Sequence, residues 1–158
     1  MGKQKVTKLT TNESIGDFTH VIRLSASDMV DAGTSTITFA TIPAGAGVDL
    51  AMATESVAIE GATDITLDVG TASDVDTLID NLDVDGANGT PVANTGTSFV
   101  QSAGNTTIAG GSLPVELKAS DTAVTYTLGG SVSSITGGEL IIGIRMIDLG
   151  RFTEASNI

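Results

Sequence analysis

The residues that could do chemistry are few, and their densest group is an acidic stretch in the middle of the chain. Asn81, Asp83 and Asp85 alternate oxygen-bearing side chains and lead to Gly86, which is how a calcium loop of the EF-hand kind begins. Such a loop places a bidentate glutamate six residues after the glycine, and here that position is Val92. Asn81, Asp83 and Asp85 are the side chains that would bind a metal ion. Because the pattern is incomplete, we expect a solvated acidic loop with no metal and no other cofactor.

Other catalytic side-chain types are scarce. The chain has no cysteine and one histidine, His20, so a hydrolytic triad would need His20 as its general base. His20 shares the apolar face of the run Phe18, Ile22 and Leu24, which predicts a buried or interfacial histidine. No nucleophile elbow, phosphate-binding loop or zinc-protease motif occurs in the sequence. We therefore expect no enzyme activity.

The charge and hydropathy of the chain point away from nucleic acids and membranes. Seven lysines and arginines stand against 19 aspartates and glutamates, a net charge of −12, and such a surface repels phosphate backbones. No apolar run approaches the roughly 20 residues that cross a bilayer, and no hydrophobic stretch follows the first lysines as in a secretory signal. The sequence predicts a protein made in the cytoplasm that binds neither nucleic acid nor membrane.

Short strands must position any site. Apolar and polar residues alternate with a period of two through most of the chain, glycine-rich turns recur, and only 3% of the residues are aromatic. This pattern predicts an all-β protein, an antiparallel β-sandwich of the jelly-roll-like kind with one short helix. We expect three parts: a flexible N-terminal arm over residues 1–16, the sandwich over 17–152, and a C-terminal tail over 153–158.

Local signals predict individual elements. The helix is expected over residues 73–82, where apolar side chains fall at i, i+3, i+4 and i+7, and residues 25–33 are expected to form a turn. Residues 122–128 are expected to pair with 113–118. A change of apolar parity predicts a bulge or turn around residues 54–56. The expected hairpin turns are the glycine pairs 110–111, 129–130 and 137–138.

The last strand-like run, Glu139 to Leu149, is apolar on both faces. Such a strand is either central in its sheet or covered by another subunit. The lysines cluster at the other end of the chain, where they could contact an acidic partner. The residues expected to make the subunit contact are Ile141, Ile147, Leu149 and Phe152, and those expected to contact a partner surface are Lys3, Lys5 and Lys8.

The phrases ITLDVG, DVDTLID and GGELIIGIRMIDLGRF resemble small structural proteins of tailed-phage virions, especially phages of cyanobacteria and marine bacteria, and the resemblance spans roughly residues 34–150. The resemblance implies a jelly-roll-like capsid decoration (cement) protein, made in the host cytoplasm and placed on the capsid surface. Its partners would be the major capsid protein and itself, as a homo-oligomer, a trimer rather than a dimer. A tail, fibre or head-knob component that contacts the host surface is the alternative, and a calcium- or carbohydrate-binding module is a further one.

Overall fold

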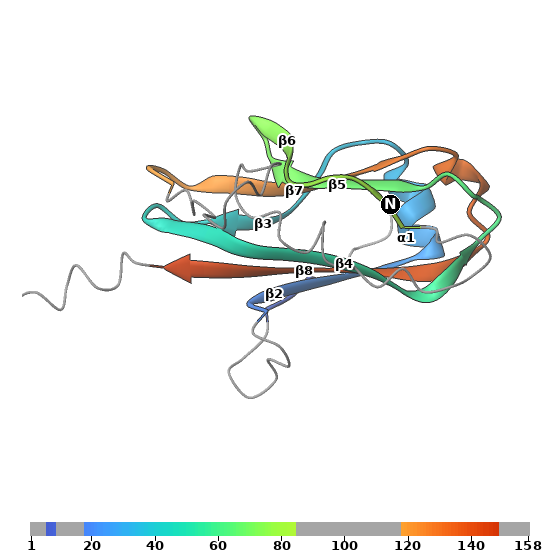
Figure 1. Cartoon of the computed structure of the whole chain (residues 1–158), viewed down its shortest axis with the longest axis horizontal. Coiled ribbons are helices and arrows are strands. Elements are labelled where there is room, and N and C mark those ends of the chain that lie inside the picture. Colours follow the sequence, from blue (N-terminus) through green and yellow to red (C-terminus); the bar gives the residue numbers. More distant parts are fainter. Residues whose placement is uncertain (1–5, 9–17, 85–117, 149–158) are drawn as a thin grey trace, which may run out of the picture.

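The chain forms two antiparallel sheets packed face to face, in a computed structural model that describes residues 6–8, 18–84 and 118–148 (Figure 1). Sheet A has the strand order β1-β2-β8-β4, and sheet B has the order β3-β7-β5-β6. The elements are β1 (Val6–Lys8), β2 (His20–Ser25), α1 (Ala26–Ala32), β3 (Ile37–Ile42), β4 (Ala46–Glu60), β5 (Thr66–Thr71), β6 (Asp74–Asp83), β7 (Thr122–Gly129), the 3-10 helix η1 (Val132–Ser134) and β8 (Gly137–Asp148). The predicted all-β antiparallel sandwich is confirmed.

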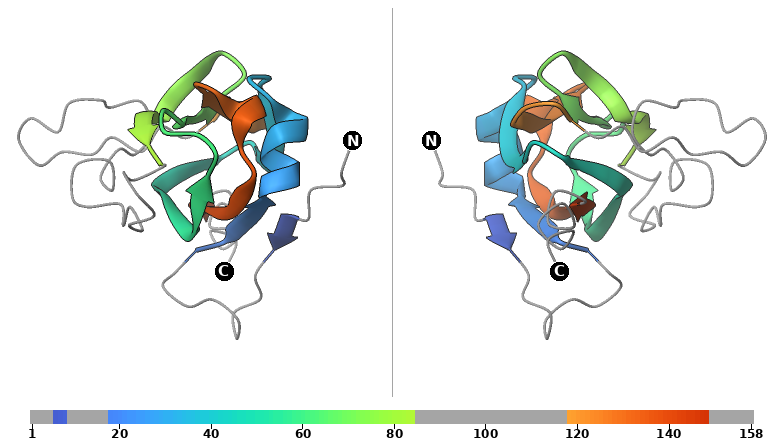
Figure 2. Two further views of the ribbon diagram at one scale, coloured as in Figure 1. Left: turned by 90° about the vertical axis from the view of Figure 1, so that its right-hand side faces the viewer. Right: turned by 90° about the vertical axis from the view of Figure 1, so that its left-hand side faces the viewer.

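The strand pairing is nested. β2 pairs with β8, and β3 pairs with β7, so early strands of the body pair with late ones. β4 lies along β8 in one sheet, while the next strand, β5, lies along β7 in the other. This wrapping of the chain between two layers, seen end-on in Figure 2, is that of a jelly-roll-like sandwich. β8, which contains most of the apolar run Glu139 to Leu149, lies between β2 and β4 and is therefore a central strand. A central position is one of the two explanations that the sequence offered for a strand that is apolar on both faces.

The core lies between the sheets and is mainly aliphatic. Its aromatic members, Phe39 of β3 and Tyr126 of β7, stack at a tilt with ring centroids 6.0 Å apart. The alternation of the strands is reproduced: every second residue of β7 and β8 points into the core, and the residues between them point outward. The fully buried side chains from β2, β7 and β8 include Ile22, Leu24, Val124, Tyr126, Leu128, Leu140, Ile142 and Ile144.

The helix expected over residues 73–82 is wrong, because this segment is strand β6 at the edge of sheet B. Leu82 pairs with Leu67 of β5, and Ile79 pairs with Val69, so two residues of β6, Asp80 and Asn81, oppose one of β5, Asp68. Asn81 takes up the extra residue as a bulge, with φ of 49°. A bulge places residues three apart on the same face, which imitates the apolar spacing of a helix.

The one α-helix of the described residues, α1, lies where a turn was expected. Its N-terminus has a capping box: the Asp28 amide donates to Ser25 Oγ, and the Ser25 amide donates to the Asp28 carboxylate. Gly33, with φ of 56°, ends the helix and donates to the carbonyl of Met29. Met29 and Ala32 are buried, and α1 packs against β2, β8 and η1 at one end of the sandwich. The short capped helix closes that end of the core.

Three further expectations have different outcomes. β4 is continuous but its register with β8 shifts between Glu55 and Val57, so the bulge expected around residues 54–56 is confirmed. The glycine pairs 129–130 and 137–138 are not hairpin turns, because the chain between β7 and β8 crosses from sheet B to sheet A. Both edges of β7 are taken by β3 and β5, and Lys118, the described residue of the strand expected beside it, exchanges backbone hydrogen bonds with Gly45 and Ala46 instead. Gly110, Gly111 and residues 113–117 lie outside the described residues.

Candidate functional site: the outer face of sheet A

The acidic candidates for a metal site do not form a loop. Asn81 and Asp83 belong to strand β6, where Asp83 pairs with Thr66 and the Asn81 amide donates to Asp68 Oδ1 at 2.6 Å. Asp85 lies outside the described residues. No three histidine or acidic side chains in the described ranges gather closely enough to hold a metal ion. The arrangement of Asn81 and Asp83 therefore does not fit the calcium loop that their spacing suggested.

An acidic pair marks the start of β6. A hydrogen bond between the side chains of Asp74 and Asp76 raises the pKa of Asp74, and the repulsion between the two carboxylates acts in the same direction, while Lys118 acts against it. Asp74 is fully exposed, so the pair is solvated. It contributes to an acidic edge on sheet B and is not buried as a catalytic carboxylate pair would be.

Hydrogen bonds of His20 and its neighbour Thr19 hold the start of β2 against β8. Thr19 Oγ1 donates to the carbonyl of Ile144 at 3.2 Å, accepts from the amide of Met146 at 2.9 Å, and lies 3.0 Å from His20 Nδ1. His20 is half-buried and pairs with Ile144 in β8. The hydrogen bonds give this end of β2 a structural role, in line with a histidine held within the sheet.

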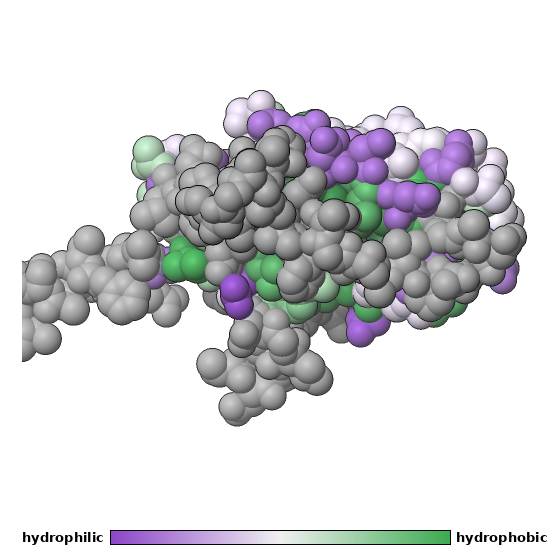
Figure 3. All heavy atoms as spheres, in the orientation of Figure 1, coloured by the Kyte–Doolittle hydropathy of each residue, from purple (hydrophilic) through white to green (hydrophobic). Residues whose placement is uncertain are grey.

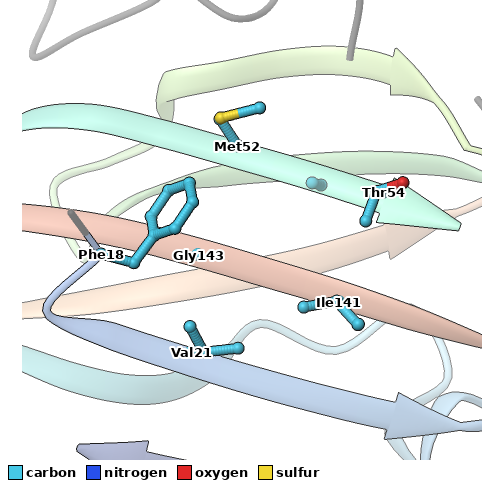
Figure 4. Close-up of a pocket in the computed structure, with 7 residues that line it drawn as sticks. Phe18, Val21, Met52, Thr54, Ile141 and Gly143 are labelled. Atoms are coloured by element: carbon cyan, nitrogen blue, oxygen red, sulfur yellow. The ribbon is translucent and has the colours of Figure 1, made fainter. Parts of the chain in front are cut away.

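The outward side of sheet A carries an apolar surface around a pocket. Ile22, Leu24, Ile142 and Ile144 point into the core, so the residues that alternate with them in β2 and β8 point outward. The outer-face pocket, as we call it, has a volume of about 90 Å³. Its lining comes from β2, β4, β8 and one residue that precedes β2, and consists of Phe18, Val21, Met52, Ala53, Thr54, Ile141 and Gly143 (Figure 4).

Glycine at position 143 makes room for the aromatic ring at the rim of the pocket. A Cβ at position 143 would lie 2.8 Å from Phe18 Cδ1 and 3.0 Å from Phe18 Cε1, well inside the roughly 3.5 to 4.0 Å of an ordinary carbon contact. The ring of Phe18 therefore lies over the bare backbone of β8. In Figure 4, Met52 stands on one side of this position and Val21 and Ile141 on the other. Phe18 was expected to share the inward face of Ile22; it lies on the outward side, because β2 begins only at His20.

The two outer faces of the sandwich differ in charge. On sheet A, Arg23 forms an exposed ion pair with Glu139 at 2.9 Å, and Arg145 alternates with Ile144 and so points outward. Sheet B carries aspartates and threonines on its outward positions, such as Asp68 and Thr38. Figure 3 shows hydrophilic residues along the upper side, where β5, β6 and β7 lie. Sheet A thus carries apolar groups together with charges of both signs, and sheet B carries acidic groups.

The predicted contact residues divide between this face and the parts outside the described residues. Ile141 lines the outer-face pocket, and Ile147 lies on the same outward side of β8, paired with Gly47 of β4. Lys8 lies in β1, paired with His20, so part of the expected arm is a strand of sheet A. The remaining four, Lys3, Lys5, Leu149 and Phe152, lie outside the described residues.

The sequence reasoning missed most of the pocket lining. Val21 and Met52 look like any other apolar strand residues in the sequence, and their neighbours across the sheet depend on strand order. The outward parity of Val21 relative to Ile22 and Leu24 was one signal in the sequence. Gly143 was a second, because a glycine inside a strand marks a place where another group approaches the backbone closely.

Comparison of the chain with protein-family models, with curated proteins and with solved structures gave no match. Among the described residues, no helix is long and apolar enough to cross a membrane.

Proposed function

We propose that this protein is a structural component of a phage virion, a decoration protein that binds the outside of the capsid and stabilises it. The observation that carries the proposal is the apolar outer face of sheet A. The sandwich buries its core between the sheets, and the outward Val21, Met52 and Ile141 do not belong to that core. An apolar surface beyond the core is typical of a contact with another protein.

The size of the outer-face pocket favours a protein partner over a small substrate. Ligand pockets measure about 300 to 1,000 Å³ and contain a few placed polar groups. The outer-face pocket measures about 90 Å³, and Thr54 supplies the single polar side chain of its lining. Such a site accommodates one apolar side chain of a neighbouring molecule. Its lining holds no titratable side chain that could act as a general acid or base on a reactant.

The identity of the partner rests on the resemblance of residues 34–150 to virion proteins. We propose the major capsid protein as one partner and further copies of the chain as the other, in a trimer rather than a dimer. The net charge of −12 keeps such a protein soluble before assembly. Lys3, Lys5 and Lys8 oppose this charge near the N-terminus and would contact an acidic shell.

The test is whether the protein accompanies purified intact particles in many copies. We expect a copy number comparable to that of the capsid protein, and capsids that lose their contents at lower temperature when the protein is missing. A few copies, confined to tail fractions, would favour the tail or fibre alternative. Absence from particles would reject both.

The lysine contact has its own matched test. We expect the double variant Lys3→Gln, Lys5→Gln to occupy purified capsids less than the native protein does. The control, Thr38→Glu with Thr41→Glu, makes the same change in net charge on exposed positions of sheet B. Equal occupancy by the two variants would show that net charge, and not a lysine contact, governs attachment.

A further inference from the structure

We propose that the outer-face pocket receives the side chain of Phe152 from a second copy of this chain. The inference rests on the proposed self-assembly and is independent of attachment to a capsid. The occupant of the outer-face pocket would be the segment that follows β8 in a neighbouring copy. The two copies would therefore contact each other through different surfaces.

The pocket is suited to one large apolar side chain. Phe18, Val21, Met52 and Ile141 form its apolar wall, and Gly143 leaves its floor without a side chain. An apolar cavity of about 150 Å³ is known to hold a whole benzene ring. An open pocket of about 90 Å³ therefore suits part of a ring, with the remainder covered by the surrounding face.

Aromatic residues are rare in this chain, which narrows the candidates. Of four phenylalanines and one tyrosine, Phe39 and Tyr126 stack in the core and Phe18 forms the rim of the pocket. Phe99 and Phe152 remain. Phe152 comes four residues after the end of β8, the strand that contributes Ile141 and Gly143 to the pocket and carries the outward apolar positions on to Ile147.

Chain geometry excludes the pocket of the same molecule. Gly143 and Asp148 are five strand residues apart, about 17 Å at about 3.3 Å per residue. Phe152 is four residues beyond Asp148, at most about 14 Å of extended chain, and a reversal of direction uses at least two of them. Within one molecule, Phe152 can therefore return along β8 only as far as Ile147, which is short of Gly143. The pocket of a second copy carries no such restriction.

Charge also favours this segment. Two copies of a protein of net charge −12 repel each other, so a self-contact must join surfaces that lack excess acid. Residues 149–158 contain one arginine and one glutamate, Arg151 and Glu154. The face that would receive them carries Arg23, Arg145 and Glu139, and Glu60 of β4 is exposed near its end, so the two signs balance. Neither surface adds to the repulsion.

The absence of native cysteine permits a clean cross-linking test. Chains carrying Thr54→Cys are mixed with chains carrying Phe152→Cys and oxidised, and we expect a disulfide-linked dimer of one chain of each kind. The control replaces Thr54→Cys with Thr38→Cys, on the exposed outer face of sheet B. A dimer yield no higher than that of the control would overturn the inference.

Other occupants give distinguishable results. Dimers from the Thr54→Cys chain alone, in higher yield than from the mixture, would show that two sheet A faces stack on each other. An internal link in the double variant Thr54→Cys, Phe99→Cys, formed faster than the dimer, would assign the pocket to residues 85–117 of the same chain. Either result overturns the inference.

Sedimentation of the full chain gives a second measurement. We expect Phe152→Ala to weaken self-association about 10- to 100-fold, the effect of leaving one large apolar side chain unburied. Thr153→Ala, in the same segment, serves as the control and is expected to leave association unchanged. Native protein that stays monomeric would overturn the inference. If it also decorates capsids, the proposed function stands without it.

Discussion

A glycine-to-alanine substitution is expected to change the free energy of unfolding by different amounts on the two outer faces. Gly143 of β8 and Gly70 of β5 are both buried glycines at outward positions of strands that lie inside their sheets. An alanine Cβ at Gly143 meets the ring of Phe18 at 2.8 Å. At Gly70 it lies 2.2 Å from the backbone oxygen of Asp74 and 2.4 Å from the carbonyl carbon of Val75. The first obstacle is a side chain at the rim of an open pocket, and the second is backbone.

The expected change in the free energy of unfolding depends on whether the group that meets the new methyl can move. For Gly143→Ala, a shift of the Phe18 ring costs little, and replacing a strand glycine by alanine recovers about 0.5 to 1 kcal/mol. We expect the free energy of unfolding to stay within about 1 kcal/mol of the native value. For Gly70→Ala, the turn between β5 and β6 must move and strain the pairing of Thr71 with Asp74. We expect a loss of about 2 to 3 kcal/mol, the upper part of the range for overpacking.

Urea denaturation followed by circular dichroism measures both variants. With a slope of about 2 kcal/mol per molar, Gly70→Ala is expected to lower the midpoint by about 1 M or more and Gly143→Ala by less than about 0.5 M. Equal shifts of the urea midpoint, or a larger shift for Gly143→Ala, would contradict an open pocket beside Phe18 and a close backbone approach at Gly70.

Three further predictions concern single contacts. Glu55→Ala removes the acceptor of the buried Ile59 amide, so we expect a loss of about 1 to 3 kcal/mol in urea denaturation, and a smaller change for Glu55→Gln, which keeps an acceptor. Ser25→Ala removes the cap of α1 and should cost about 1 kcal/mol by the same assay; no loss would contradict the capping geometry. Because the pKa of Asp74 is raised, its contribution to stability is lost as the pH rises through that pKa. Asp76→Asn should therefore raise the melting temperature at pH 7, and the gain should vanish in acid below the ordinary aspartate pKa; a gain that persists there would refute this.

Periodicity in the sequence was sufficient to predict the class of fold. It also predicted which residues point inward in several strands. Leu140, Ile142 and Ile144 alternate with outward residues, and they are buried in the structure as the alternation predicts. The same rule failed over residues 73–82, because the bulge at Asn81 gives a strand the apolar spacing of a helix. It also passed over the seven-residue helix α1, although Ser25 and Gly33 carried the capping signals.

The outer-face pocket depended on tertiary structure. Met52 lies opposite Gly143 because β4 pairs with β8 in one register, and Val21 lies opposite Gly143 on the other side because β2 does the same. These pairings join residues about 90 to 120 positions apart, and a local pattern holds no information about them. Sequence alone determined that β8 is apolar on both faces, since alternation is a property of one strand. Strand order determined which outward residues meet, because a surface is made by neighbours across the sheet.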